Sequence, residues 1–307
     1  MQIILDTKEI LSLPEILSLL QESVYAPTPE KLSARAEGYR QDGSISALCL
    51  MEDSVLLGLL ICREQPDLVE ILDLAVRKSH QRQGLGRKLL GEASIRFRKE
   101  LFAETDDDAV EFYSRCGFVV RSLGEKYPGI VRYQCRRQDE ILDLYDQNRC
   151  RLGKFHRRGD PLPESTCLLG AEIWVISGQK LLLTQRSPQK THPYQWEGTG
   201  GLAQAGEDSL ACIKRELLEE TGLDISKETP LLLLQYRRPA GFTDVYAIRK
   251  KVDLSKLTLQ PSEVMGAKLV SLNEFDLMCH NGQVVSTVEG RFRLIEDQIE
   301  ALMEPLL

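Results

Sequence analysis

The sequence predicts an α/β protein that folds as two domains. The chain has 307 residues, more than a single hydrophobic core usually serves, and each half is long enough to bury its own core. Each half also contains a strand-like run that leads through glycines into a helix-like run, within residues 70–98 and 181–223. The polar run 136–140 lies between them, so we expect domains at residues 1–137 and 138–307.

Short apolar and amphipathic runs predict the order of the elements. In the first domain we expect helices at 14–23, 30–38 and 87–98, and strands at 46–51, 55–63, 70–76, 101–105 and 127–136. In the second we expect strands at 181–187 and near 268–272. We also expect a terminal helix from 289 to 307, which packs through Phe292, Leu294, Ile295, Ile299 and Leu302.

The glycine turn of the first domain predicts an anion site. Gly84 and Gly86 follow a strand-like run and precede a helix, so backbone N–H groups and the helix dipole favour a phosphate there. The turn lacks the third glycine of a dinucleotide-binding fingerprint, because Leu89 stands there. It is not a P-loop either, since no Gly-Lys-Ser/Thr follows.

The turn resembles the acetyl-coenzyme A motif of the GNAT acetyltransferases, Gln/Arg-x-x-Gly-x-Gly/Ala. The run 107–118 adds a second GNAT pattern, Ala-x-x-Phe-Tyr-x-x-x-Gly-Phe. The resemblance implies a mixed sheet with flanking helices, acetyl-coenzyme A as cosubstrate and an amine acceptor. The residues implied to bind the cofactor are Val76, Gln81, Arg82, Gln83, Gly84, Gly86 and Arg87.

The same resemblance implies catalytic roles for two kinds of side chain. Tyr113 would protonate the departing coenzyme A thiolate, although packing beside Phe112 is the alternative. Glu70 and Asp73 lie on the strand beside the expected acceptor. Because their spacing is odd, we expect them to face opposite sides of the strand, and we favour Glu70 as the base.

The second domain contains a helix with three carboxylates on one face. Glu216, Glu219 and Glu220 stand at i, i+3 and i+4, where like charges repel unless a cation lies between them. Hard carboxylate oxygens on a rigid element suit Mg²⁺ or Mn²⁺. A solvated acidic face is the alternative, but the opposite face is apolar and Arg215 is placed to orient a carboxylate.

This segment resembles the Nudix box, Gly-x5-Glu-x7-Arg-Glu-U-x-Glu-Glu-x-Gly-U, in which U is a bulky aliphatic residue. The matching residues are Gly201, Glu207, Arg215, Glu216, Leu217, Glu219, Glu220, Gly222 and Leu223. The resemblance implies an α/β/α sandwich that hydrolyses a diphosphate linked to a further group with a divalent metal.

By this resemblance, Glu216, Glu219 and Glu220 would hold the metal, and the backbone of Gly201 would contribute near it. A pair between Glu207 and Arg215 would brace the loop against the helix. Families of this kind often add a carboxylate from a loop before the closing strand, and Glu263 is our candidate for that base or extra ligand. On electrostatic grounds Arg186, at the end of a strand, is expected near a phosphate, and a surface ion pair is the alternative.

The residues before the box resemble the isopentenyl-diphosphate isomerase branch of the Nudix family, with Trp196-Glu197 and the run 143–159 carrying the likeness. The isomerase needs a cysteine just before the box, and the run 195–199 has none. The run 182–187 partly matches the coenzyme A pyrophosphatases, but Thr199 stands where they have proline. We therefore expect hydrolysis.

Composition limits the classes of binding partner and the cellular compartments that we expect. A net charge of −7 argues against nucleic acid as the main partner. No apolar stretch reaches the length of a membrane span and no signal peptide opens the chain. The eight cysteines form no CxxC pair, which is typical of a reducing cytoplasm and argues against structural zinc.

The sequence thus predicts a bifunctional protein, with a Mg²⁺-dependent diphosphate hydrolase joined to an acetyltransferase. The alternative is that the first domain only binds acetyl-coenzyme A as a sensor, because glycines that bind without turnover would look the same.

Overall fold

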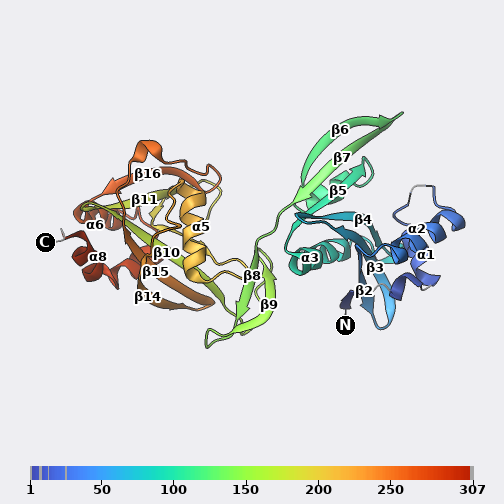
Figure 1. The fold of residues 1–307 in the computed structure, drawn as a ribbon, viewed down its shortest axis with the longest axis horizontal. Helices are drawn as coiled ribbons and strands as arrows, with labels where there is room; N and C mark the ends of the chain where they lie inside the picture. The colour runs from blue at the N-terminus through green and yellow to red at the C-terminus, as the bar shows by residue number, and fades with distance from the viewer. Residues whose placement is uncertain (1, 7–8, 13, 25, 305–307) are drawn as a thin grey trace. The chain divides into compact units, whose positions relative to one another are not determined.

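The computed structural model describes residues 2–6, 9–12, 14–24 and 26–304. The chain forms two compact units (Figure 1). The first extends to Ile141 and includes Arg157–Gly159, and the second comprises Leu142–His156 and the chain from Asp160 onward. Asp139 and Glu140 belong to the first unit, where Arg137 and Arg157 pair with Asp139.

A seven-stranded mixed sheet forms the centre of the first unit, in the order β1-β2-β3-β4-β5-β7-β6. Its strands are β1 (Gln2–Asp6), β2 (Ile45–Glu52), β3 (Val55–Glu64), β4 (Leu68–Val76), β5 (Glu100–Asp106), β6 (Val119–Tyr127) and β7 (Ile130–Arg137). Neighbouring strands are antiparallel except β4 and β5, which are parallel.

Helices cover both faces of this sheet. On one face α1 (Pro14–Leu20) and α2 (Pro29–Gln41), with the short turn η1 (Glu9–Ser12), pack against alternate residues of β2 and β3. On the other face α3 (Leu85–Phe97), which follows η2 (Lys78–His80), packs with α4 (Val110–Arg115) over the remaining residues. The predicted mixed sheet with flanking helices is confirmed.

The last strand of the first domain differs from the prediction. Instead of one strand over 127–136, the chain forms a hairpin in which Tyr127 ends β6 and β7 begins at Ile130. Almost every residue of β6 is exposed, because this strand lies at the edge of the sheet. An exposed edge strand has no buried apolar face, so its sequence lacks the alternation that reveals strands.

A bulge in β4 changes the direction of its side chains. Ile61 pairs with Asp73 and Cys62 pairs with Ile71, so Leu72 is an extra residue. Before the bulge Ile71 packs on the α3 side, whereas after it Ala75, two residues beyond Asp73, packs on the α2 side.

The second unit is built on a mixed sheet with the path β12-β11-β10-β15-β14, in which β13 pairs with β10 and β16 with β11. These strands are β10 (Leu168–Ser177), β11 (Lys180–Arg186), β12 (Trp196–Glu197), β13 (Thr199–Leu202), β14 (Leu231–Arg238), β15 (Gly241–Arg249) and β16 (Val264–Val270). Only β10 and β15 are parallel. Strands β8 (Ile141–Tyr145) and β9 (Arg151–Arg157) form a separate pair.

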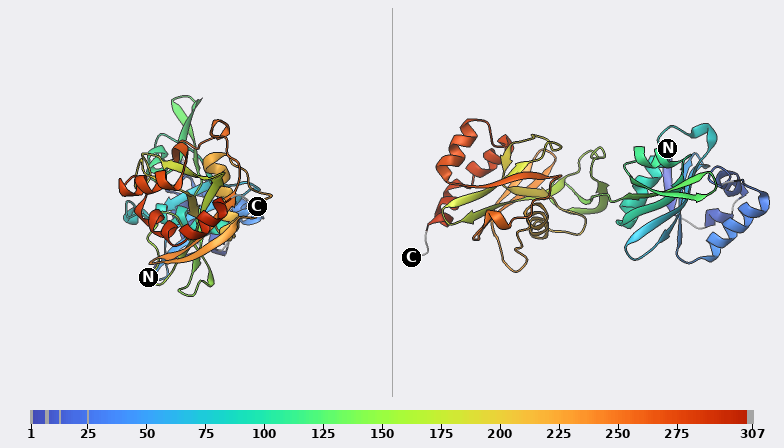
Figure 2. Two further views of the ribbon diagram at one scale, coloured as in Figure 1. Left: turned by 90° about the vertical axis from the view of Figure 1, so that its left-hand side faces the viewer. Right: turned by 90° about the horizontal axis from the view of Figure 1, so that it is seen from above.

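Helices on opposite faces make this unit an α/β/α sandwich, as predicted (Figure 2). α5 (Ser209–Thr221) packs on one face beside Ala171 and Phe242. α6 (Leu272–His280), α7 (Ser286–Arg293) and α8 (Glu296–Met303) pack on the other, and η3 (Leu254–Lys256) lies in a loop.

The terminal helix prediction is wrong in two respects. The chain forms α7 and α8 instead of one helix, and Leu294, expected to pack, is 56% exposed beside the break. Phe292, Ile295 and Ile299 are buried as predicted, and Leu302 is partly buried against the same core. Residues 305–307 of the predicted helix lie outside the described residues.

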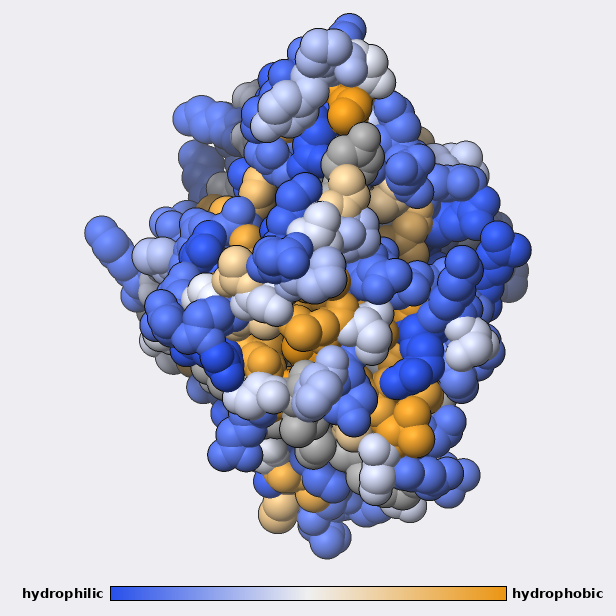
Figure 3. Space-filling model, turned by 90° about the vertical axis from the view of Figure 1, so that its right-hand side faces the viewer, coloured by the Kyte–Doolittle hydropathy of each residue, from blue (hydrophilic) through white to orange (hydrophobic). Residues whose placement is uncertain are grey.

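Across the described residues, the helices are too short or too polar to span a lipid bilayer. On the face shown in Figure 3, apolar residues gather in the middle and hydrophilic residues surround them.

Candidate functional site

Helix α5 is held at both ends by the signals that the sequence contains. The side chain of Asp208 accepts a hydrogen bond from the amide of Ala211, which caps the N-terminus. Gly222 ends the helix in the left-handed region, at φ 73°. Ile213 and Leu217 are fully buried, so the opposite face, with its carboxylates, has a fixed orientation.

Arg215 joins four parts of this site. Its Nε and Nη2 atoms donate to the two carboxylate oxygens of Glu207 at 2.8 and 3.0 Å, so the predicted brace is confirmed. Its Nη1 atom lies 3.0 Å from both Glu216 and Glu219, and Nη2 also donates to the carbonyl of Leu202. One guanidinium thus reduces the repulsion between two carboxylates of α5.

Gly201 lies directly against Glu216. A Cβ atom at position 201 would stand 2.1 Å from Oε1 of Glu216, so the carboxylate occupies the space that a side chain would fill. Only glycine allows this approach, and it brings the backbone of strand β13 to the carboxylate face of α5.

Glu220 and Glu263 meet at a lysine that the sequence interpretation missed. Lys190 places its Nζ atom 3.1 Å from Oε1 of Glu220 and 2.6 Å from Oε2 of Glu263. Burial raises the pKa of Glu220 to about 7, although Lys190 opposes the shift. The structure therefore brings the candidate Glu263 to the carboxylates of α5. Lys190 gave no signal because it lies in an irregular loop.

Two further buried carboxylates lie where strands β10 and β11 diverge. These strands pair only at Ile176–Leu181 and Ser177–Lys180, and then β13 and β12 replace them as partners. Glu172 and Glu197 are both buried. Burial raises the pKa of each carboxylate, and the charge of Glu197 raises the pKa of Glu172 further.

An arginine accompanies each of these carboxylates. Arg291 of α7 donates from Nε to Glu172 at 2.9 Å, and Nη1 of Arg186 contacts both oxygens of Glu197 at 2.6 and 2.7 Å. Arg186, expected near a phosphate, is thus engaged by a carboxylate. Sequence spacing gave no sign of the Glu172–Arg291 pair, because 119 residues separate its members.

The chemistry of the α5 donors fits Mg²⁺ or Mn²⁺, since the helix presents carboxylate oxygens, and the carboxylate of Glu216 lies against the backbone of Gly201. Within the described residues, however, no three His, Cys, Asp or Glu side chains are grouped closely enough to hold a metal ion. Glu216 and Glu219 are instead paired with Arg215, and Glu220 with Lys190.

In the first unit the glycine turn has the geometry of an anion site. Gly84 precedes α3 with φ 81°, and a Cβ atom there would meet nothing within 4 Å. Gln81 donates to the carbonyl of Val76 at 3.0 Å, which ties the turn to the end of β4. Arg82, at φ 61°, and Gln83 are exposed, and Arg87 donates to the carbonyl of Arg115. The first amides of α3, which have no acceptor within the helix, thus follow an exposed turn.

Gly86 is needed for a different reason than the sequence suggested. A Cβ atom at this position would lie 3.0 Å from the ring of Phe112 in the neighbouring helix α4. Gly86 is buried, so its small size allows α3 and α4 to pack.

Strands β4 and β5 separate beside this turn. They pair from Leu68–Glu100 to Ile71–Ala103, and then β4 continues to Val76 and β5 to Asp106 without pairing to each other. The facing edges of two strands are therefore available to an extended ligand. Tyr113 belongs to the core on the α3 side, with edge-on contacts to Phe112 and Phe118, and burial raises the pKa of its phenol.

Glu70 and Asp73 face the same side of the sheet, contrary to the prediction. The extra residue Leu72 shifts the alternation of side chains by one, so these two residues, three apart, point the same way. Asp73 is buried and accepts hydrogen bonds from Arg35, Tyr39 and Ser23 on the α2 side. Glu70 is less buried and accepts from Arg63 at 3.0 Å and from Gln65.

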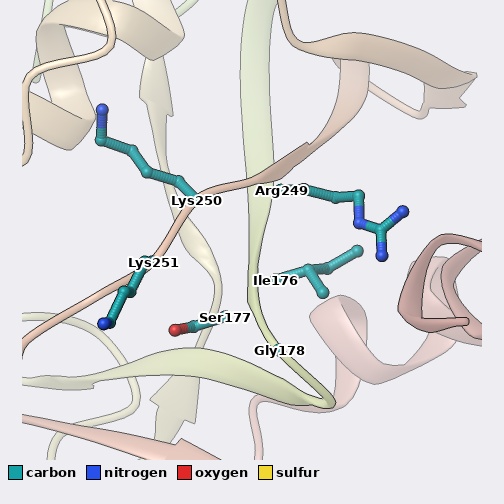
Figure 4. A pocket seen from close by; sticks show the side chains of 6 residues that line it. All are labelled: Ile176, Ser177, Gly178, Arg249, Lys250 and Lys251. Atoms are coloured by element: carbon teal, nitrogen blue, oxygen red, sulfur yellow. The ribbon is translucent and has the colours of Figure 1, made fainter. Parts of the chain in front are cut away.

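A pocket of about 500 Å³ lies at the β10–β11 turn, lined by Ile176, Ser177, Gly178, Arg249, Lys250 and Lys251 (Figure 4). The basic side chains do not converge, because Arg249 points away from Lys250 and Lys251. Lys250 pairs with Glu228 and Arg249 donates to the carbonyl of Glu304. The pocket contains none of the predicted site residues.

Comparison with known proteins identifies both halves of the chain. A model of the NUDIX domain matches residues 169–286, and a model of the acetyltransferase (GNAT) family matches residues 13–118. Among solved structures, DR0079 from Deinococcus radiodurans is 21% identical with a TM-score of 0.42, covering 48% of this chain and 92% of that one. The ribosomal-protein-S18-alanine N-acetyltransferase of Escherichia coli is 22% identical with a TM-score of 0.36, covering 44% and 92%.

A relative from Listeria monocytogenes, named as the uncharacterized Nudix hydrolase lmo0368, is 32% identical over 149 residues. The match covers 48% of this chain and 88% of the relative. Because nearly the whole relative is matched at this identity, the chain belongs to the Nudix hydrolase family, and it also carries a GNAT domain.

Proposed function

We propose that the Nudix domain hydrolyses a diphosphate linked to a further group and that it requires Mg²⁺ or Mn²⁺. The observation that carries this proposal is the carboxylate face of α5, which Arg215 fixes and which Gly201 approaches from strand β13 and Glu263 from the turn before β16. Such a set of oxygen donors suits a hard cation that also binds phosphate.

In this proposal Glu216, Glu219, Glu220 and the backbone of Gly201 hold the metal. When bound, the metal neutralises phosphate charge and lowers the pKa of water. Glu263 accepts the proton of the attacking water, because its side chain is partly exposed at the same place. Lys190, between Glu220 and Glu263, orients both carboxylates and adds positive charge beside the phosphate.

The cysteine positions support hydrolysis over isomerisation. Cys212, which lies on α5 itself, is fully buried on the packed side of the helix. Burial raises the pKa of its thiol, so it is a poor acid or nucleophile for bond rearrangement.

Substitution of Glu220 tests the hydrolase proposal. A panel of diphosphate compounds is incubated with Mg²⁺, and the released products are quantified. We expect Glu220→Gln to lower turnover by about 1,000-fold or more, since a ligand and its charge are both lost. Glu228→Gln is the matched control, because Glu228 is also ion-paired, with Lys250, but lies outside the site. Equal turnover in Glu220→Gln and Glu228→Gln would reject the assignment.

We also propose that the GNAT domain binds acetyl-coenzyme A and transfers its acetyl group to an amine. The diverging edges of β4 and β5 and the open turn at Gly84 support binding. Tyr113 remains the candidate proton donor to the departing thiolate, because a phenol is protonated at neutral pH, although burial raises its pKa and makes it a weaker acid. Glu70 remains the candidate base, because Asp73 is committed to three hydrogen-bond donors.

Binding without transfer is the second candidate function for this domain. Asp73 is paired with Arg35 and Glu70 with Arg63, so neither carboxylate is unpaired and ready to act as a base. Calorimetry of the full chain with acetyl-coenzyme A, followed by a transfer assay on an amine panel, separates the two. Heat of binding with no transfer to any amine favours the sensor, and the absence of heat rejects both.

A further inference from the structure

Arg238 is a cation that lies flat on the sheet of the Nudix domain. It is the last residue of β14 and pairs with Gly241 of β15. Cβ atoms at Gly241 and Gly170 would lie 3.1 and 3.4 Å from its Nη2 atom. Because both positions are glycines without side chains, the guanidinium lies directly against the backbone of two neighbouring strands.

The hydrogen-bonding capacity of this guanidinium is mostly unused. Nη2 donates to the carbonyl of Phe242 at 3.1 Å, while Nε is buried and has no partner. Among the described residues no carboxylate lies within 4.0 Å of Arg238. A guanidinium has five N–H donors, and a partly buried cation without a counter-charge is destabilising.

The positive charge of a neighbouring arginine, Arg291, further destabilises the charged form of Arg238. Burial and the positive charge of Arg291 both lower the pKa of Arg238. Arg291 itself is neutralised by Glu172, as Arg186 is by Glu197. Arg238 is therefore a surplus positive charge beside two balanced pairs.

Arg238 and the α5 carboxylates lie on opposite faces of the sheet. Arg238 contacts Gly170, whereas Glu216 contacts Gly201, which pairs with the next residue, Ala171. Side chains of consecutive strand residues point to opposite faces, and Ala171 packs on the α5 side. An anion bound by Arg238 is thus distinct from a phosphate bound at Glu216.

We propose that Arg238 binds an anionic group, a phosphate or a carboxylate, on the face of the sheet opposite α5. Because this face is opposite the proposed metal site, the inference goes beyond the proposed hydrolase function and adds a second, separate anion site. The ligand anion supplies the counter-charge that the chain does not. Ligands that lack such a group leave the guanidinium unpaired and bind less tightly.

The test measures anion binding without metal. Full-length protein in EDTA is titrated with inorganic phosphate by calorimetry, and with acetate in a second series, which distinguishes the two anion types. We expect Arg238→Gln to raise the Kd for the preferred anion by about tenfold or more, and Arg238→Lys to raise it less. In anion-free buffer Arg238→Gln should also unfold at a higher temperature than wild type, because repulsion from Arg291 is removed.

Arg237→Gln is the matched control. Arg237 precedes Arg238 but lies on the α5 face, over the ring of Phe242, and donates to the carbonyl of Gly241. Its substitution should leave the Kd within about twofold. The proposal fails if wild type binds neither anion, or if Arg238→Gln and Arg237→Gln bind equally well. Because metal is absent, this failure is independent of the Glu220→Gln result, which tests the hydrolase proposal alone.

Discussion

Gly201→Ala is expected to disturb the metal site through a single methyl group. The added Cβ would stand 2.1 Å from Oε1, 2.2 Å from Cδ and 2.7 Å from Oε2 of Glu216. Ordinary contact begins near 3.4 Å, so the carboxylate must withdraw by about 1.3 Å. The backbone of Gly201 is not in the left-handed region, and the effect therefore comes from overlap alone.

The magnitude follows from that displacement. The overlapped atoms are the end of a flexible side chain that can swing aside, so we expect a loss of about 1 kcal/mol of unfolding free energy, the low end of the range for overpacking. A misplacement of about 1 Å lowers a rate by roughly 100-fold. We expect both effects for Gly201→Ala, measured by urea denaturation and by Mg²⁺-dependent hydrolysis of the best substrate in the diphosphate panel.

A second substitution should relieve the overlap. Glu216→Asp shortens the side chain by one methylene, so Gly201→Ala combined with Glu216→Asp should unfold at a higher urea concentration than Gly201→Ala alone. Gly290→Ala serves as the control, because a Cβ there would meet nothing within 4 Å on helix α7. Wild-type stability and turnover in Gly201→Ala would refute the contact between Gly201 and Glu216.

Three further predictions concern the GNAT domain. Tyr113→Phe should slow acetyl transfer while diphosphate hydrolysis is unchanged, and a loss in both assays would contradict separate sites. Gly84→Ala should weaken acetyl-coenzyme A binding in calorimetry by more than Gly129→Ala does. Gly129, at φ 76° in the β6–β7 turn, is the control, because alanine there imposes the same left-handed strain of about 1 kcal/mol. Gly86→Val should lower both stability and binding, because its side chain overlaps Phe112, and an unchanged melting temperature would exclude that overlap.

The parts of the fold that the sequence predicted are those whose signals are local. Helix α5 has its capping aspartate, its apolar stripe and its final glycine within 15 residues of chain, and it forms as expected. Strand β6 was missed because exposure removes the apolar alternation. The terminal segment was predicted as one helix because its apolar residues continue through Leu294. In the structure Leu294 lies at the break between α7 and α8.

The candidate site residues show the same difference between local signals, which the sequence reveals, and contacts between distant segments, which it does not. Glu207 and Arg215 are eight residues apart within one motif, so the resemblance to the Nudix box was enough to predict their contact. Lys190, Glu172 and Arg291 reach the site only after distant segments fold together, and no local pattern marks them. The assignment of Glu70 and Asp73 to opposite faces failed because one extra residue cannot be recognised from alternation alone.

The bulge at Leu72 has a consequence for how this strand tolerates changes in length. Deleting Leu72 would remove the extra residue and leave Ile71 opposite Cys62 and Asp73 opposite Ile61, so Asp73 would still face Arg35 and Tyr39. A change in length that moved Asp73 to the α3 side would instead bury an unpaired carboxylate in the apolar core, at a much greater cost in stability. We therefore expect β4 to tolerate the loss of one residue at position 72, and related sequences to include some that pair here without a bulge.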